Sequence, residues 1–148
     1  MNSNNNMKYW FPVIVWIGII FWMSTAMFTA QNTSSIVEPI LRFLFPSRSH
    51  REIEHLHFVI RKLAHLTEYF ISGLLLFRAF RSGSDERHAG RWVLYSFIVL
   101  VLLASSDEYH QSFVGGRSAS IVDVGIDAIG GIAALAISTL KRWFKQNA

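Results

Sequence analysis

Two stretches of the sequence carry polar side chains at spacings that could support chemistry on an anionic group. RKLAHLTEY (61–69) contains a basic pair, a histidine, an acid and a tyrosine. DEYHQSFVGGRSASIVD (107–123) contains three acids, a glutamine and an arginine. Guanidinium and ammonium groups suit phosphate oxygens. Histidine carries protons near neutral pH, and carboxylates bind hard cations such as Mg²⁺.

These residue types divide into three predicted roles. His65 is the candidate general acid/base or nucleophile, with Glu68 or a later acid setting its tautomer. The predicted catalytic residues are His65, Glu68, Asp107, Glu108 and Asp123. The predicted ligand-binding residues are Arg61, Lys62, Tyr69, Gln111, Arg117 and Asp127. The candidate ligands of a divalent cation, with Mg²⁺ as the candidate ion, are Asp107, Asp123 and Asp127.

Helical periodicity places these groups on shared faces. At about 100° per residue, the polar residues of the first stretch fall within an arc of about 120°. These residues are Arg61, Lys62, His65, Glu68, Tyr69 and Ser72. Asp107, Glu108 and Gln111 share a second face, with His110 pointing elsewhere. A third stripe combines Asp123 and Asp127 with small residues that permit close helix packing, Gly130 and Ala134.

A purely structural interpretation of the same charges remains open. Lys62 or Arg61 could neutralise Asp107, and Arg117 could neutralise Asp123. However, structural ion pairing needs one or two pairs, and this chain gathers many more polar groups than that. We therefore favour a functional polar site.

The elements that must position this site are apolar enough for a membrane. Of 148 residues, 51% are hydrophobic and 16% are charged, whereas soluble domains carry about 25% charged residues. Four apolar runs approach the length that spans a hydrocarbon core of roughly 30 Å: Tyr9–Ala30, Phe58–Phe80, Trp92–Ser106 and Ile121–Leu140. The alternative is a soluble helical bundle. The chain has no cysteine, which excludes disulfides, thiolate metal sites and cysteine catalysis.

We predict an all-α, integral membrane four-helix bundle. Ser34–Phe45 should form a short helix in the membrane interface, within the first extracytoplasmic connection. The following segment contains His50, His55 and His57, which we interpret as part of a solvated linker rather than a metal cluster. Residues 1–8 should form a disordered cytoplasmic tail, and residues 9–148 a single domain. The first apolar run is longer than a usual signal-peptide core, so we expect a retained helix.

Basic residues predict the orientation, because short loops rich in Lys and Arg stay in the cytoplasm. Arg78, Arg81, Arg87 and Arg91 lie around the second connection, and Lys141, Arg142 and Lys145 near the C-terminus. Both termini should therefore be cytoplasmic in a multi-pass protein of the cell membrane. The connections near 31–57 and 109–120 then face outward, although the first breaks the rule with Arg42, Arg48 and Arg51.

The two polar stretches also resemble a known family. RKLAHLTEY, with Lys62, His65 and Tyr69, and the DE-x-x-Q…GR…D spacing of residues 107–123 are similar to the VanZ-like family of small membrane proteins, the teicoplanin-resistance type. AQNTSS (30–35), Asp127 and Gly130 extend the similarity, although the family pattern often has Asn in place of Asp127. The resemblance implies a cell-envelope protein linked to lowered lipoglycopeptide sensitivity. It supplies no mechanism.

Two functions from different classes remain open. The first is a membrane enzyme, a hydrolase or transferase that acts on a lipid phosphate or a lipid-linked cell-wall precursor. The second is a non-catalytic protein that binds an anionic lipid headgroup or a partner membrane protein. Transport is less favoured, because the four predicted helices show no inverted repeat. Although the net charge of +4 would suit nucleic acid, the apolar runs favour membrane lipids as partners and no nucleic acid.

Overall fold

The computed structural model describes residues 3–82, 89–114 and 120–147, apart from the side chains of residues 3–5 and 89. Its elements are α1 (Ser3–Met23), the 3₁₀ helix η1 (Ala26–Phe28), α2 (Ala30–Leu44), α3 (His50–Arg81), α4 (Ala89–Gln111) and α5 (Ile121–Asn147). The described residues contain no strand. The all-α prediction is confirmed.

Within the described residues, three helices are long and apolar enough to cross a membrane. They contain the candidate spans Asn6–Met23, Gly90–Gln111 and Ile121–Asn147. α3 is the longest helix, with 32 residues, but it is not among the three. The reason is chemical, since its stretch 58–80 contains Arg61, Lys62, Glu68 and Arg78.

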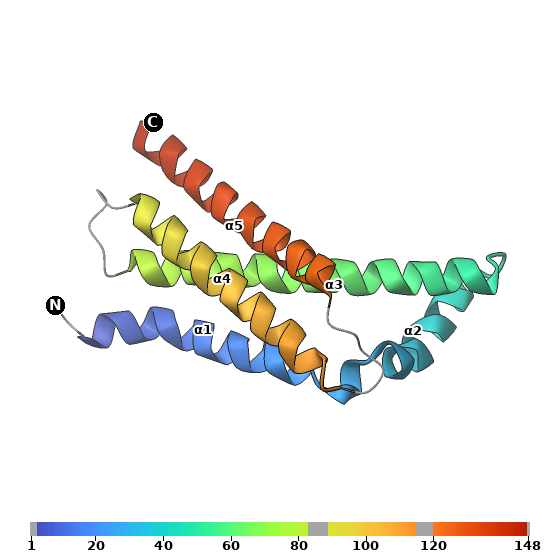
Figure 1. The fold of residues 1–148 in the computed structure, drawn as a ribbon. Helices are drawn as coiled ribbons and strands as arrows, with labels where there is room; N and C mark the ends of the chain where they lie inside the picture. Colours follow the sequence, from blue (N-terminus) through green and yellow to red (C-terminus); the bar gives the residue numbers. More distant parts are fainter. Residues whose placement is uncertain (1–2, 83–88, 115–119, 148) are drawn as a thin grey trace.

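α3 is the central helix, and it contacts α1, α2, α4 and α5. Figure 1 shows α3 along the length of the molecule, with its N-terminal part extending past α5 and with α2 folded back beneath it. The start of α1, the end of α3, the start of α4 and the end of α5 lie at the same end of the molecule. The other end of the bundle receives the polar stretches identified in the sequence.

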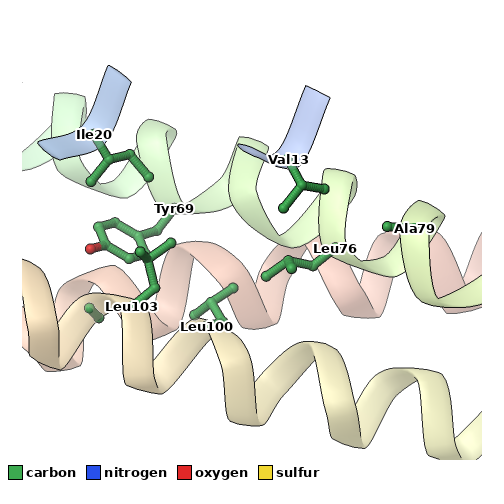
Figure 2. Packing of buried hydrophobic residues seen from close by; sticks show 8 residues of the cluster. Val13, Ile20, Tyr69, Leu76, Ala79, Leu100 and Leu103 are labelled. Atoms are coloured by element: carbon green, nitrogen blue, oxygen red, sulfur yellow. The ribbon is translucent and has the colours of Figure 1, made fainter. Parts of the chain in front are cut away.

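The apolar core lies where α1, α3 and α4 meet, as Figure 2 shows. Its buried members are Val13, Ile20, Tyr69, Leu76, Ala79, Leu100, Leu103 and Ala104. α5 approaches α3 through small residues instead. A Cβ added to Gly73 would lie 2.8 Å from Ala134 Cβ and 2.8 Å from the Gly131 carbonyl oxygen, and one added to Gly130 would fall on the Leu66 carbonyl.

The starts of α1, α2 and α3 differ from the sequence-based expectations, and α1 ends at Met23 rather than at Ala30. α1 begins at Ser3 and so extends into the tail for which we predicted disorder. α2 covers the helix expected at 34–45 but begins earlier, at Ala30, where the Thr29 side chain caps its first turn. α3 begins at His50, so the segment interpreted as a solvated linker is helical from that residue.

The early start of α3 has a local cause in a capping box. Ser49 Oγ accepts a hydrogen bond from the Glu52 backbone N–H, and the Glu52 carboxylate accepts one from the Ser49 backbone N–H. This reciprocal pair satisfies two of the donors that a helix start leaves unpaired. The bond from the Ser49 backbone, helped by Arg48, lowers the pKa of Glu52 to about 2. The carboxylate therefore stays charged, and the cap stays formed, at physiological pH.

Candidate functional site

Three side chains from three different helices meet at the centre of the polar region. His65 comes from α3, Asp107 from α4 and Asp127 from α5, and one potential ligand atom of each lies within 4.8 Å of the others. His65 Nδ1 is 3.6 Å from Asp127 Oδ1. Asp107 is 2% exposed and Asp127 is 1% exposed, so both carboxyl groups are removed from solvent.

Asp107 and Asp127 differ in the hydrogen bonds that their carboxylate oxygens accept. Gln111 Nε2 donates a 2.9 Å hydrogen bond to Asp107 Oδ2. Within the described parts of the chain, Asp107 Oδ1 and both carboxylate oxygens of Asp127 have no hydrogen-bond partner. The buried Tyr69 hydroxyl is close enough to interact electrostatically with both acids and with Glu68. Asp107 and Asp127, together with the adjacent His65, therefore form a buried group of side chains that we call the acid centre.

A second set of contacts ties the start of α5 to α3 and α4. Lys62 forms an ion pair with Asp123, and their side chains are 27% and 26% exposed. Glu108, which is buried, accepts a 2.9 Å hydrogen bond from the Ser120 backbone N–H. The structural interpretation of the sequence predicted an ion pair between Lys62 and Asp107. The structure contains an ion pair of Lys62, but its partner is Asp123.

A cavity of about 170 Å³ opens beside this centre. Its polar lining comes mainly from α3, with one residue each from α2 and α4, and its apolar lining comes from α1, η1, α2 and α3. The polar residues are Thr33, His57, Arg61, His65, Glu68 and Asp107, and the apolar residues are Ile20, Met23, Phe28, Val37, Ile60 and Ala64. The cavity therefore combines a cation, proton-carrying groups and a hydrocarbon-like wall.

Arg61 is held at the cavity by the segment that precedes α3. Its Nη1 donates to the Phe28 carbonyl oxygen at 2.9 Å and to Thr33 Oγ1 at 3.2 Å. Thr33 Oγ1 is also 3.1 Å from His57 Nε2. η1 and the first turns of α2 thus fix the position of the guanidinium group.

The structure distributes the predicted site residues over three neighbouring places. Arg61, His65, Glu68 and Asp107 line the cavity. Asp127 belongs to the acid centre, which Tyr69 and Gln111 adjoin, and Lys62, Glu108 and Asp123 form the contacts at the start of α5. Arg117 lies outside the described residues. The candidate metal set also changes, because His65 rather than Asp123 joins Asp107 and Asp127.

Two polar residues of the cavity were absent from the predicted site. His57 was assigned to a solvated linker, but it is buried on α3, one turn before Arg61. Ser49 and Glu52 carry the capping-box spacing, so continuing the helical register from Ser49 would have placed His57 and Arg61 on one face. Thr33 lies within AQNTSS (30–35), which the resemblance singled out without assigning it a role.

His110 has a structural contact at the other edge of the site. Its Nδ1 is 3.0 Å from Ser24 Oγ, and its ring stands edge-on to Phe21 with centroids 5.8 Å apart. These contacts join the end of α4 to the end of α1. His110 therefore points away from the acid centre, as the helical periodicity predicted.

Comparison with known proteins gives one informative match. A family model described as VanZ/LLP1 matches residues 9–142. This range includes every residue of the cavity and of the acid centre. No curated protein and no solved structure matches the chain.

Proposed function

The chain belongs to the VanZ/LLP1 family, and from this premise we propose that its cavity binds the anionic headgroup of a membrane lipid or a lipid-linked cell-wall precursor. The observation that carries this proposal is the lining of the cavity. Arg61 and two histidines stand beside an apolar wall that includes Ile20 and Phe28. A guanidinium group suits a phosphate, and the wall suits the first methylenes of a lipid chain.

The membrane placement that fits this proposal has four spanning helices. α3 would cross with α1, α4 and α5, because its buried polar groups face other helices rather than lipid. Charged side chains at membrane depth cost about 2.5–3.5 kcal/mol each on insertion scales unless they are shielded in this way. α2 would lie in the outer interface, where its exposed apolar residues Ile36, Ile40 and Phe43 would enter the lipid. The cavity would then open toward the outer leaflet.

The catalytic form of the proposal uses His65 as the proton carrier. Water attacks the phosphorus of the bound lipid phosphate, and its proton passes to His65. The phosphorus–oxygen bond to the leaving alcohol breaks, and that alcohol receives the proton from His65. In a transferase, an acceptor alcohol takes the place of water. Asp127, 3.6 Å from His65 Nδ1, would orient the imidazole ring and stabilise its charged form.

The test is headgroup or phosphate release by the purified protein in detergent. The substrates are defined phospholipids and undecaprenyl-type phosphates, each with and without Mg²⁺. His65→Gln should reduce turnover by about 10²–10⁴-fold, the usual contribution of a general acid/base, while lipid binding is retained. His55→Gln is the matched control, because His55 is exposed on the same helix and should leave turnover unchanged. Equal turnover in wild type and His65→Gln would contradict the catalytic role.

The second candidate is a protein that binds the same lipid without turnover. It is favoured by the contacts that several polar side chains already make within the protein. Gln111 donates a hydrogen bond to Asp107, Lys62 forms an ion pair with Asp123, and the Ser120 backbone N–H donates a hydrogen bond to Glu108. In this case no lipid is cleaved, and His65→Gln should change the lipid affinity by about 1–3 kcal/mol, the cost of one unsatisfied buried hydrogen bond. Either form would change the availability of an envelope lipid. We therefore propose lowered teicoplanin sensitivity as the cellular consequence, measurable on expression in a susceptible host.

A further inference from the structure

We propose that His65, Asp107 and Asp127 bind one divalent transition-metal ion where α3, α4 and α5 meet. This inference goes beyond the proposed lipid binding and does not depend on it, because the three side chains are supplied by the chain alone. It changes one assignment within that proposal. A histidine that binds a metal is not free to carry a proton, so His65 would act as a ligand in the metal-bound protein.

The separations of the three ligand atoms are close to those of a metal site. Zinc binds histidine nitrogen and carboxylate oxygen at about 2.0–2.2 Å, so ligand atoms on one ion lie at most about 4.4 Å apart. The three atoms here lie within 4.8 Å of one another. Small side-chain rotations are therefore enough to bring them onto one ion, without movement of the helices. Three protein ligands would leave a further position for water or a substrate oxygen, as in catalytic zinc sites.

The burial of Asp127 is the independent observation that points to a ligand. Its side chain is 1% exposed, and neither carboxylate oxygen has a hydrogen-bond partner among the described residues. Asp107 Oδ1 likewise has no hydrogen-bond partner among the described residues. Buried charges are normally paired or bound to metals, because removing them from water without compensation is very unfavourable. One divalent cation would balance the two carboxylates and occupy the oxygens that the protein leaves open.

The mixture of ligand types selects the class of ion. Imidazole nitrogen suits zinc and related transition metals, whereas Mg²⁺ prefers an octahedral shell of oxygens with several waters. The ion pair with Lys62 occupies Asp123, which removes it from the ligand set. The two possible sets therefore make different predictions. A site with His65, Asp107 and Asp127 favours Zn²⁺ or Mn²⁺, and a three-aspartate site would favour Mg²⁺.

The experiment measures metal binding to the full-length protein in detergent, without added lipid. Wild type is stripped with a chelator and dialysed against Zn²⁺, Mn²⁺ or Mg²⁺, and bound metal is counted by mass spectrometry. We expect about one equivalent of Zn²⁺ or Mn²⁺, the stoichiometry of a mononuclear three-ligand site. His65→Gln and Asp127→Asn should each weaken Zn²⁺ binding at least about tenfold, because even the loss of an outer-shell partner typically costs about 10–100-fold in metal affinity.

Two matched variants separate this site from adventitious binding. Asp123→Asn and His55→Gln should keep the wild-type stoichiometry, since Asp123 is paired with Lys62 and His55 lies on the exposed face of α3. A Co²⁺ absorption spectrum that changes in His65→Gln would place nitrogen on the ion, and size-exclusion profiles report whether each variant is folded. Absence of bound Zn²⁺ and Mn²⁺ in wild type, or equal loss in Asp123→Asn and Asp127→Asn, would overturn the proposal. Lipid binding by the stripped protein would still support the proposed function.

Discussion

At the scale of single residues, the polar groups differ in how the chain satisfies them. Lys62 and Asp123 neutralise each other across α3 and α5, and each is about a quarter exposed. Asp107 and Asp127 are almost completely buried, with oxygens left open within the described chain. The first pair therefore has a structural explanation by itself. Asp107 and Asp127 lie beside the cavity and His65, where a carboxylate oxygen without a hydrogen-bond partner can bind a ligand.

A double-mutant cycle tests the structural role of the Lys62–Asp123 pair. Removing one partner of a fully buried pair costs about 3–5 kcal/mol, and partial exposure should reduce this to about 1–2 kcal/mol through solvent screening. Lys62→Met and Asp123→Asn should therefore each lower the unfolding midpoint in detergent. The double variant should be less destabilised than the sum, with a coupling of about 0.5–3 kcal/mol.

The control for this cycle is the exposed pair formed by Arg48 and Glu52 on the N-terminal side of α3, whose side chains are 56% and 47% exposed. Arg48→Met should have a small effect, because exposed ion pairs contribute little to stability. Strictly additive effects of Lys62→Met and Asp123→Asn would show that the two side chains do not interact in the protein.

At the scale of elements, the contact between α3 and α5 positions the acid centre. Gly73 on α3 meets Ala134 and Gly131 on α5, while Gly130 meets the Leu66 backbone. Small residues let helix backbones approach closely within a membrane. Asp127 lies on α5 one turn before Gly130, and His65 lies beside Leu66 on α3. The close approach at Gly130 therefore sets the distance between His65 and Asp127.

A methyl group at Gly130 should disturb both packing and site. The new Cβ would fall on the Leu66 carbonyl, and overpacking of this kind costs about 1–3 kcal/mol. We expect Gly130→Ala to lower the unfolding midpoint and to weaken any ligand that requires His65 and Asp127 together. Gly73→Ala should behave similarly, because its neighbours are the Ala134 side chain and the Gly131 backbone.

Gly125→Ala is the matched control on the same helix. An added Cβ there meets nothing within 4 Å, and alanine is favoured over glycine in helices by about 1 kcal/mol. Gly125→Ala should therefore leave stability unchanged or raise it. Equal effects of Gly125→Ala and Gly130→Ala on the unfolding midpoint would mean that the close approach of α3 and α5 contributes nothing.

At the scale of the whole molecule, the sequence predicts the long helices better than the way in which they pack against one another. The apolar runs and the 3.6-residue periodicity were enough to predict an all-α membrane protein and to place Asp107, Glu108 and Gln111 on one buried face. Periodicity also identified the stripe of Asp127, Gly130 and Ala134, all of which are buried. These features depend on one helix at a time, which is why a single sequence reveals them.

Features that depend on several helices were harder to predict. The pairing of Lys62 with Asp123, and the replacement of Asp123 by His65 in the acid centre, follow from how α3 and α5 are rotated against each other. Periodicity within one helix carries no information on that rotation. His57 is buried where α2 packs against α3, with Thr33 Oγ1 3.1 Å from His57 Nε2, whereas a polar sequence by itself predicts exposure to solvent. The proposed membrane orientation likewise depends on how Lys and Arg are distributed over several connections and not on a single helix.

The orientation can be tested directly, because the chain contains no cysteine. The start of α1 and the end of α5 lie at the same end of the molecule as the end of α3 and the start of α4, the helix ends on either side of the second junction. If the arginines around that junction keep it in the cytoplasm, both termini are inside and the cavity faces outward. A membrane-impermeant maleimide added to intact cells should then label Ser118→Cys and spare Ser84→Cys, which should react only after the membrane is opened. Ser96→Cys, at a position that is completely buried, should stay unlabelled until the protein is denatured. Labelling of Ser84→Cys from outside would reverse the orientation and move the proposed lipid site to the cytoplasmic leaflet.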